Sequence, residues 1–310
     1  MNESGHKPVL LDEVLHGLAV HPAGTYVDCT FGRGGHAAAI LARLGDQGRL
    51  VVFDRDPAAI SAARARFGGD ARVNCIHASF SRVAAEIRKL GVGPVQGILF
   101  DLGVSSPQLD NSDRGFSFQH DGLLDMRFDP ESGMTAADWL KRAPEREIAE
   151  VLKRFGEERR ARRIARAIVQ ARAEAPLTRT GQLSELVASA APARERHKHP
   201  ATRTFQAIRI HVNAELDELM AALPEAMGIL APGGRLVVIS FHSLEDRIVK
   251  RFMRDEARGV EGPRALPAAG PLRAPRLKII VKAARPGAAE LASNPRARSA
   301  VLRIAEKIAA

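Results

Sequence analysis

The residues best suited to chemistry in this sequence are a glycine-rich segment and an acid that follows it. Residues 31–36 read FGRGGH and come directly after a short apolar run. Glycines let the backbone turn sharply and approach a ligand, because no Cβ stands in the way. Asp54 ends the next apolar run, about 20 residues after Gly32, the distance at which an acid binds the ribose hydroxyls of a nucleotide cofactor. Together the two features predict a nucleotide-like cofactor.

The glycine segment alone leaves the identity of that cofactor open. Gly32, Gly34 and Ala37 fit the dinucleotide fingerprint with alanine in its last position. Nicotinamide adenine dinucleotide and S-adenosylmethionine are therefore comparable interpretations, and a plain strand–turn–helix without a ligand is a third. Residues 230–235, LAPGGR, make a tight turn that is frequent in class I methyltransferases, as is an antiparallel last strand. These features favour S-adenosylmethionine.

Three further candidate side chains follow apolar, strand-like runs. Asp101 begins a polar segment, residues 101–108, beside the point where ligands bind in open α/β sheets. There it could pair with an ammonium group or cap a helix. Phe80 could lie against an adenine ring or belong to the core. His242 could contact a substrate base or phosphate, or be a hydrogen-bonded structural histidine.

Short apolar segments alternate with helical patterns over the first hundred residues. The predicted strands are residues 25–29, 49–53, 72–77 and 96–102, and the predicted helices are residues 35–44, 57–67 and 84–90. An amphipathic helix precedes them, because Val14, Leu15 and Leu18 repeat at helical spacing. This rhythm predicts an α/β fold with a parallel, Rossmann-like sheet covered by helices.

The alternation stops after residue 102, and the next convincing strand is residues 235–240. A crossover needs far fewer than the about 135 residues that separate these strands. We therefore expect one domain, residues 1–106 and 214–310, interrupted by an inserted helical domain, residues 107–213. Apolar residues at helical spacing indicate one long helix from Phe205 to Leu223 that returns the chain to the sheet.

The chain beyond residue 240 reads as a helix, a loop and two strands. The helix covers residues 244–255, and the loop, rich in glycine, proline and alanine, covers residues 258–275. Residues 277–282 and 300–305 are the last two predicted strands. They look like a hairpin at the edge of the sheet.

The charge of the chain points to a polyanionic partner. Its 310 residues include 46 lysines and arginines against 36 acids, a formal net charge of +10. Nucleic acid is the first candidate, with a solvated basic surface as the alternative. Because aromatic residues make up only 5% of the chain, RNA binding should depend on charge and shape. Eight basic residues gather in the predicted insertion: Lys153, Arg154, Arg159, Arg160, Arg162, Arg163, Arg166 and Arg172.

Composition also excludes several classes of protein. Cys29 and Cys75 are too few for a disulfide framework and lie in strand-like runs, so both are expected in the core. No cysteine–histidine cluster has zinc spacing, and no metal site is predicted. The first residues lack a secretory signal, and no apolar run reaches the ~18 residues that span a bilayer. We expect a cytoplasmic protein without a membrane partner.

Longer segments carry a resemblance that extends over nearly the whole chain. The matching segments are residues 6–11, 30–36, 101–110, 114–118, 199–209, 240–247 and 294–299. In the same order they resemble the bacterial small-subunit ribosomal RNA cytosine-N4 methyltransferases, the RsmH or MraW family. Residues 258–275 are the part without a match.

This resemblance implies a reaction, a cofactor and a partner. The reaction is methylation of N4 of one cytidine in the decoding region of 16S rRNA, with S-adenosylmethionine as the methyl donor. The partner is 16S rRNA or the 30S subunit, and the fold is a Rossmann-like methyltransferase domain with a helical insertion. The cofactor contacts that it implies are Gly34, Gly35, His36, Asp54, Phe80, Asp101 and Gln108.

The residues also suggest how the cytosine amine is held. Amino-methylating enzymes often carry a short Ser/Asp/Asn-Pro-Pro-aromatic loop after the fourth strand, and residues 105–108, SSPQ, occupy that place without the aromatic residue. We expect Ser106 or the neighbouring backbone to orient N4, and Asp101 to accept its proton. His242 is the candidate for a contact to the RNA. No nucleophilic cysteine is expected, because an exocyclic amine attacks the methyl group directly.

Two other functions are alternatives to this one. A nicotinamide-dependent oxidoreductase would need a proton-relay histidine or a tyrosine–lysine pair, and the single tyrosine, Tyr26, lies inside the first predicted strand. A non-catalytic RNA-binding assembly factor would keep the fold without the chemistry, and the intact glycine segment and Asp101 argue against it. The oligomeric state is open between monomer and homodimer.

Overall fold

The computed structural model describes residues 8–191, 199–259 and 274–309. The chain divides into two compact units. The first unit is Met1–Gly103 with Leu216–Ala310, and the second is Val104–Glu215. The boundaries expected from the sequence, 106/107 and 213/214, fall within a few residues of these. The loop expected over residues 258–275 lies mostly outside the described residues.

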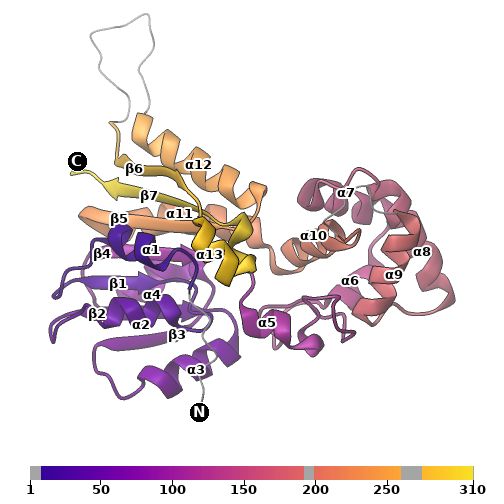
Figure 1. Ribbon diagram of the computed structural model, residues 1–310, viewed down its shortest axis with the longest axis horizontal. Coiled ribbons are helices and arrows are strands. Elements are labelled where there is room, and N and C mark those ends of the chain that lie inside the picture. The colour runs from indigo at the N-terminus through magenta and orange to yellow at the C-terminus, as the bar shows by residue number, and fades with distance from the viewer. Residues whose placement is uncertain (1–7, 192–198, 260–273, 310) are drawn as a thin grey trace, which may run out of the picture. The chain divides into compact units, whose positions relative to one another are not determined.

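The first unit holds one seven-stranded sheet in the order β3-β2-β1-β4-β5-β7-β6 (Figure 1). Its strands are β1 (Thr25–Asp28), β2 (Arg49–Asp54), β3 (Val73–His77), β4 (Val95–Asp101), β5 (Leu230–Ser240), β6 (Leu277–Ala284) and β7 (Val301–Lys307). Strands β1 to β5 pair in parallel, and β7 is antiparallel to both of its neighbours. The predicted α/β fold with a Rossmann-like sheet is confirmed, and the first four predicted strands differ from the observed ones only at their end residues.

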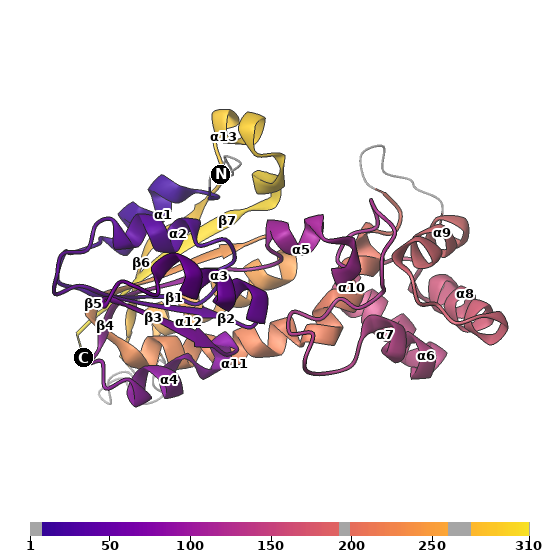
Figure 2. The same ribbon diagram turned by 90° about the horizontal axis from the view of Figure 1, so that it is seen from below.

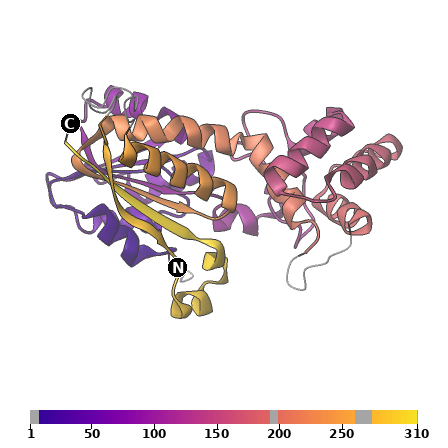
Figure 3. The same cartoon turned by 90° about the horizontal axis from the view of Figure 1, so that it is seen from above.

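Helices cover both faces of this sheet, because successive side chains of each strand enter two different cores. In β4, Ile98 and Phe100 enter one core, and Leu99 enters the other. On the face of Leu99 lie α1 (Leu11–Leu18), α2 (Gly35–Leu41) and α3 (Pro57–Phe67). On the opposite face lie α4 (Val83–Lys89), α11 (Glu215–Ile229) and α12 (Ser243–Arg258). Figure 2 shows these layers, and Figure 3 shows α11 and α12 side by side.

The last two strands form the predicted antiparallel pair, but their placement in the sheet was not foreseen. β7 lies between β5 and β6, so the strand that comes last in the sequence is internal, and β6 is the edge. Residues 301–305 of β7 are all buried, as an internal strand requires, whereas β6 is mostly exposed or half-buried. The connection between them contains α13 (Ala288–Ser293) and the short helix η4 (Pro295–Ser299).

β5 begins earlier than the sequence indicated. Leu230 already pairs with Val95, and Arg235 pairs with Gly97. The ladder changes register between these two pairs, so the turn-like residues 231–234 bulge out of the strand. Gly233, with φ of 78°, supplies the left-handed backbone conformation that this bulge needs.

The second unit is built from helices around its own apolar core. The helices are α5 (Ser106–Asp110), α6 (Ala136–Arg142), α7 (Glu145–Gly156), α8 (Ala161–Glu174), α9 (Thr180–Ala190) and α10 (Thr202–Asn213), with the short helix η2 (Ser112–Arg114) after α5. Leu140, Ile148, Ile164, Leu183 and Ile208 bring five of these helices into that core. Across the described ranges of both units, no helix has the length and apolar character that a membrane span requires.

The prediction of one long helix from Phe205 to Leu223 is wrong. The chain turns at Ala214, whose φ of 51° is left-handed, so α10 ends there and α11 begins. A non-glycine residue in this conformation costs about 1–2 kcal/mol. The turn is held by Asn213, which accepts from Phe128 N at 2.7 Å and donates to Met126 O at 2.7 Å. These tertiary contacts are invisible in the helical period, which continues across the break.

Candidate active site

The glycine segment forms the turn between β1 and α2. Gly32 and Gly34 have φ of 54° and 71°, in the left-handed region that favours glycine. A Cβ on Gly34 would lie 2.4 Å from the Phe31 ring, and a Cβ on Gly35 would lie 2.3 Å from Pro8 Cγ. Both distances are shorter than real Cβ contacts, so a larger residue at either position would displace Phe31 or Pro8.

Asp54, at the carboxyl end of β2, is tied to that turn. Its Oδ2 accepts from Gly32 N at 2.8 Å, and its Oδ1 accepts from Asp56 N at 2.8 Å. Burial raises the pKa of Asp54 to about 6, against the lowering effect of these backbone hydrogen bonds. Each carboxylate oxygen has two lone pairs, so Asp54 keeps acceptor capacity for the hydroxyls of a ribose.

Asp101 and Asp28 end the neighbouring strands β4 and β1, and Thr30 joins them. Thr30 Oγ1 accepts from Asp101 N at 2.7 Å, and Thr30 N donates to Asp28 Oδ1 at 3.1 Å. Burial raises the pKa of Asp28 to about 7. It also raises the pKa of Asp101 well above its usual value, with smaller contributions from Asp28 and Glu245. Burial therefore raises the pKa values of three acids, Asp28, Asp54 and Asp101, at the carboxyl ends of β1, β2 and β4.

Two oxygens of these acids lack a partner. Within the described part of the chain, Asp28 Oδ2 and Asp101 Oδ1 are buried and accept no hydrogen bond. Although the Asp101 side chain is 25% exposed as a whole, the exposure is therefore not at Oδ1. An unpartnered buried carboxylate oxygen is unfavourable, so the two atoms suit a ligand that brings a positive charge or a hydrogen-bond donor.

His36 lies in the first turn of α2 and contacts Asp101. Its Nδ1 lies 3.5 Å from Asp101 Oδ2, and its Nε2 lies 3.0 Å from Val9 O. Burial lowers the pKa of His36 to about 4, so the ring is neutral at neutral pH. The structure thus brings Gly34, Gly35, His36, Asp54 and Asp101 together around the carboxyl ends of β1, β2 and β4.

Phe80 lies in the short helix η1 (Phe80–Arg82) after β3. It is half-buried, and its ring packs edge-to-face on Phe100, with 5.6 Å between the ring centroids. This packing gives Phe80 a place beside the core of the first unit. Its contact with an adenine ring stays a prediction.

Ser106 and Gln108 belong to the second unit, where both lie buried in α5. Gln108 Oε1 accepts from Ser105 N at 2.9 Å, which helps to begin this short helix. The local structure therefore gives Gln108 a capping role. The roles expected for Ser106 towards N4 and for Gln108 towards the cofactor stay predictions.

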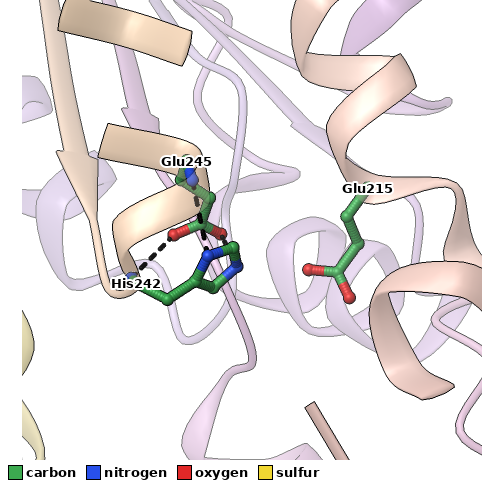
Figure 4. Close-up of side chains that lie close together, drawn as sticks. All are labelled: Glu215, His242 and Glu245. Carbon is green, nitrogen blue, oxygen red and sulfur yellow. Dashed lines mark hydrogen bonds and ion pairs between the residues drawn. The ribbon is translucent and has the colours of Figure 1, made fainter. Parts of the chain in front are cut away.

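His242 follows β5 and begins α12 as its N-cap. Its Nδ1 accepts from Glu245 N at 3.4 Å (Figure 4), and Glu245 Oε2 also accepts from Phe241 N at 2.8 Å. His242 Nε2 lies 3.1 Å from Glu245 Oε1, without the alignment of a hydrogen bond. These contacts support the structural interpretation of His242, and its contact with RNA stays a prediction. Glu215, also drawn in Figure 4, belongs to the second unit and pairs there with Arg209 at 2.7 Å.

Three residues of this region were not singled out from the sequence: Asp28, Thr30 and Glu245. The signal for Asp28 was present, since it is an acid at the end of an apolar strand and three residues before the glycine segment begins at Phe31. The two cysteines fit the roles expected for them. Cys29 is buried, which raises the pKa of its thiol well above the usual value, and burial also raises that of Cys75. Neither is poised as a thiolate nucleophile.

Comparison with known proteins gives matches over almost the entire chain. The model of the MraW methylase family matches residues 3–308. A ribosomal RNA small subunit methyltransferase H of Thioalkalivibrio sulfidiphilus is 59% identical over 306 residues, 98% of each chain. The proteins of the same name from Xanthomonas campestris pv. campestris and Thiobacillus denitrificans are each 56% identical. The alignment with the Xanthomonas protein covers 98% of this chain and 88% of that protein. The alignment with the Thiobacillus protein covers 99% of this chain and 98% of that protein.

Proposed function

The chain belongs to the MraW methylase family, and from this membership we propose that it methylates N4 of a cytidine in the decoding region of 16S rRNA. The methyl donor is S-adenosylmethionine. The names of the three relatives support ribosomal RNA of the small subunit as the substrate class. Position and base come from the resemblance of the sequence motifs. Membership of a methylase family also excludes the nicotinamide-dependent oxidoreductase as a function.

The observation that carries the proposal is the pair of unpartnered acid oxygens beside the glycine turn, Asp28 Oδ2 and Asp101 Oδ1. S-adenosylmethionine, when bound, supplies an electrophilic methyl group on a positively charged sulfur, together with an ammonium group. Asp101 would pair with that ammonium group. Asp54 would accept hydrogen bonds from the ribose hydroxyls, and Phe80 would lie against the adenine ring. The donor set therefore fits the cofactor.

The remaining cofactor contacts of the proposal follow from the turn and from the second unit. Gly34 and Gly35 would let the backbone approach the cofactor, because neither has a Cβ, and an added Cβ would displace Phe31 or Pro8. His36 would orient Asp101 from the side, through the 3.5 Å contact of Nδ1 with Oδ2. Gln108 would contribute from the start of α5.

For this reaction the protein must hold the N4 amine of the cytosine in place and remove one proton from it. In the transfer a bond forms between N4 and the methyl carbon, the bond from sulfur to that carbon breaks, and N4 gives up one proton. Much of the rate of such a displacement comes from positioning. Ser106 or its neighbouring backbone would orient N4, and ionised Asp101 would accept the proton. His242 would contact the base or a phosphate.

The exposed arginines of the second unit support RNA as the partner. Arg162, Arg163 and Arg166 lie exposed on α8. Arg172 on the same helix donates instead to the carbonyl oxygens of Leu140 and Ala143, where α6 ends, so its role is structural. Phosphate contacts by the exposed side chains would be independent of sequence and sensitive to salt.

Transfer of a labelled methyl group from S-adenosylmethionine to 30S subunits that lack the modification tests the proposal. Nucleoside mass analysis should find N4-methylated cytidine with the wild-type protein and none with Asp101→Ala. Free 16S rRNA in parallel reactions tells whether the substrate is naked RNA or the assembled subunit. Cofactor binding without transfer to either would contradict the proposal and support the non-catalytic assembly factor. A methyl group on another atom or base would contradict the assignment of N4.

A further inference from the structure

Asp28 is a buried acid to which the proposed reaction gives no role. Its side chain is 1% exposed, and within the described residues its Oδ2 accepts no hydrogen bond. Its other oxygen accepts from Thr30 N at 3.1 Å, and Thr30 Oγ1 lies 3.5 Å from it. A buried acid with one unpartnered oxygen destabilises the fold, which indicates that Asp28 has a role in function and not in stability.

The groups around Asp28 are acidic or neutral. Asp54, at the end of β2, acts on it electrostatically, and Asp101, at the end of β4, is joined to it through Thr30. Glu245 of α12 acts on Asp101 in turn. His36 of α2, which faces Asp101, is neutral, and the neighbouring Cys29 is a buried thiol. The surroundings therefore favour a positive charge that arrives with a ligand.

We propose that Asp28 is a specificity-determining residue that makes this site prefer the cationic methyl donor to the uncharged thioether that remains after transfer. The inference rests on the proposed function, since it takes S-adenosylmethionine as the donor. Before transfer the sulfur carries a positive charge. After transfer the electron pair of the broken carbon–sulfur bond stays on sulfur, which becomes neutral. The positive charge passes to N4 with the methyl group and is then lost as a proton. A buried anion therefore favours the substrate form of the cofactor over the product form, which helps product to leave.

Three ligands separate this role from a merely structural one. S-adenosylmethionine carries the charged sulfur, and sinefungin carries an amine-bearing carbon in its place, whereas S-adenosylhomocysteine carries neither. All three share the ribose, the adenine and the amino-acid group that Asp54, Phe80 and Asp101 are proposed to hold. Differences among them therefore report on charge at the position of the sulfur, and losses common to all three report on damage to the site.

The experiment measures the dissociation constants of the three ligands by titration calorimetry for the wild type, Asp28→Asn and Asp56→Asn. At about pH 8, Asp28→Asn should weaken S-adenosylmethionine and sinefungin about tenfold and S-adenosylhomocysteine less than about twofold. The loss should disappear at about pH 5.5, where Asp28 is protonated in the wild type as well. Asp56→Asn is the matched control, because Asp56 is a buried acid that caps α3 through Ala58 N at 3.0 Å, and asparagine caps equally well.

A second measurement uses only the wild-type protein, so a folding defect of Asp28→Asn would not affect it. In buffers of different ionisation enthalpy near pH 7, the wild type should release more protons on binding S-adenosylmethionine than on binding S-adenosylhomocysteine. Equal weakening of all three ligands by Asp28→Asn, or equal proton release, would overturn the inference and leave the proposed function intact. A wild-type protein that bound none of the three would overturn the proposed function itself.

Discussion

Nδ1 of His36 lies 3.5 Å from Oδ2 of Asp101, while the opposite ring nitrogen, Nε2, lies 3.0 Å from the carbonyl oxygen of Val9. A carbonyl oxygen can only accept, so Nε2 carries the proton of the neutral ring. Nδ1 then presents a lone pair to Asp101. Because burial raises the pKa of Asp101 well above its usual value, a protonated carboxyl facing this lone pair suits the protein without ligand. A cationic ligand would favour loss of that proton.

The first prediction concerns the anchoring of His36. His36→Ala removes a buried side chain and leaves Val9 O without its partner, so the free energy of unfolding should fall by about 1–3 kcal/mol. His16→Ala is the control, because His16 is exposed although its Nδ1 makes a similar contact with Asp12 O at 2.9 Å. That change should stay within about 0.5 kcal/mol. Urea unfolding measures both, and equal effects would show that His36 anchors nothing.

The second prediction concerns pH and Asp28. Its pKa in the folded protein is raised from 3.8 to about 7 by burial, so its favourable contribution to stability is fully present below about pH 3.8 and is lost as the pH rises through 7. Asp28→Asn cannot ionise. Without cofactor, the variant should therefore gain stability relative to the wild type between about pH 5 and pH 8, on the order of 1–3 kcal/mol.

Comparison of variant and wild type at each pH isolates Asp28 from its neighbours. Burial lowers the pKa of His36 to about 4, so His36 contributes stability that is present above pH 6.5 and is lost as the pH falls through 4, the opposite direction. Asp70→Asn is the control, because the side chain of Arg72 lowers the pKa of half-buried Asp70 to about 2. Asp70 is ionised at both pH values, so its effect should be the same at each. A flat difference for Asp28→Asn would contradict its raised pKa.

The strands and helices of the sheet domain could be predicted from the sequence where the local pattern of apolar residues determines them. Strands β1 to β4 are short apolar runs between helical stretches, and α3 matches its predicted range, Pro57–Phe67. Strand order and the break at Ala214 were not accessible. The position of β7 between β5 and β6 depends on pairing across the sheet, and the turn at Ala214 depends on contacts that Asn213 makes far along the chain. Neither the strand order nor this turn changes the spacing of apolar residues along the sequence, so hydrophobic periodicity does not reveal them.

The site was accessible where a residue type is unusual for its surroundings. Glycines before a helix and acids after strands singled out Gly34, Asp54 and Asp101. Asp28 has the same property but lies one position before Cys29, inside the run that reads as a strand, and was counted with the strand. The hydrogen bond of Thr30 with Asp101 and the electrostatic effect of Glu245 on Asp101 join residues that only the fold brings together.

The third prediction separates steric fit from backbone strain in the glycine turn. Gly34→Ala places a Cβ 2.4 Å from the Phe31 ring at φ of 71°, whereas Gly91→Ala has φ of 63° and nothing within 4 Å of the new atom. Gly91→Ala should cost about 1 kcal/mol, from the left-handed conformation alone. Gly34→Ala should cost about 1–3 kcal/mol more, because the Phe31 ring must move. It should also weaken S-adenosylmethionine binding. Equal costs in thermal unfolding would mean that Phe31 does not shape the turn.

The fourth prediction concerns the exposed arginines of α8, Arg162, Arg163 and Arg166. If each contacts a phosphate, the triple change to alanine should lower the slope of log affinity against log salt by about 2 to 3 for 16S rRNA. S-adenosylmethionine binding should not change, because none of the three arginines is among the proposed cofactor contacts. The matched control replaces three exposed arginines of the first unit, Arg43, Arg49 and Arg64. Filter binding over a range of salt measures both variants. The same slope change in both would mean that RNA attraction comes from overall charge, and an unchanged slope in the α8 variant would remove that helix from the RNA interface.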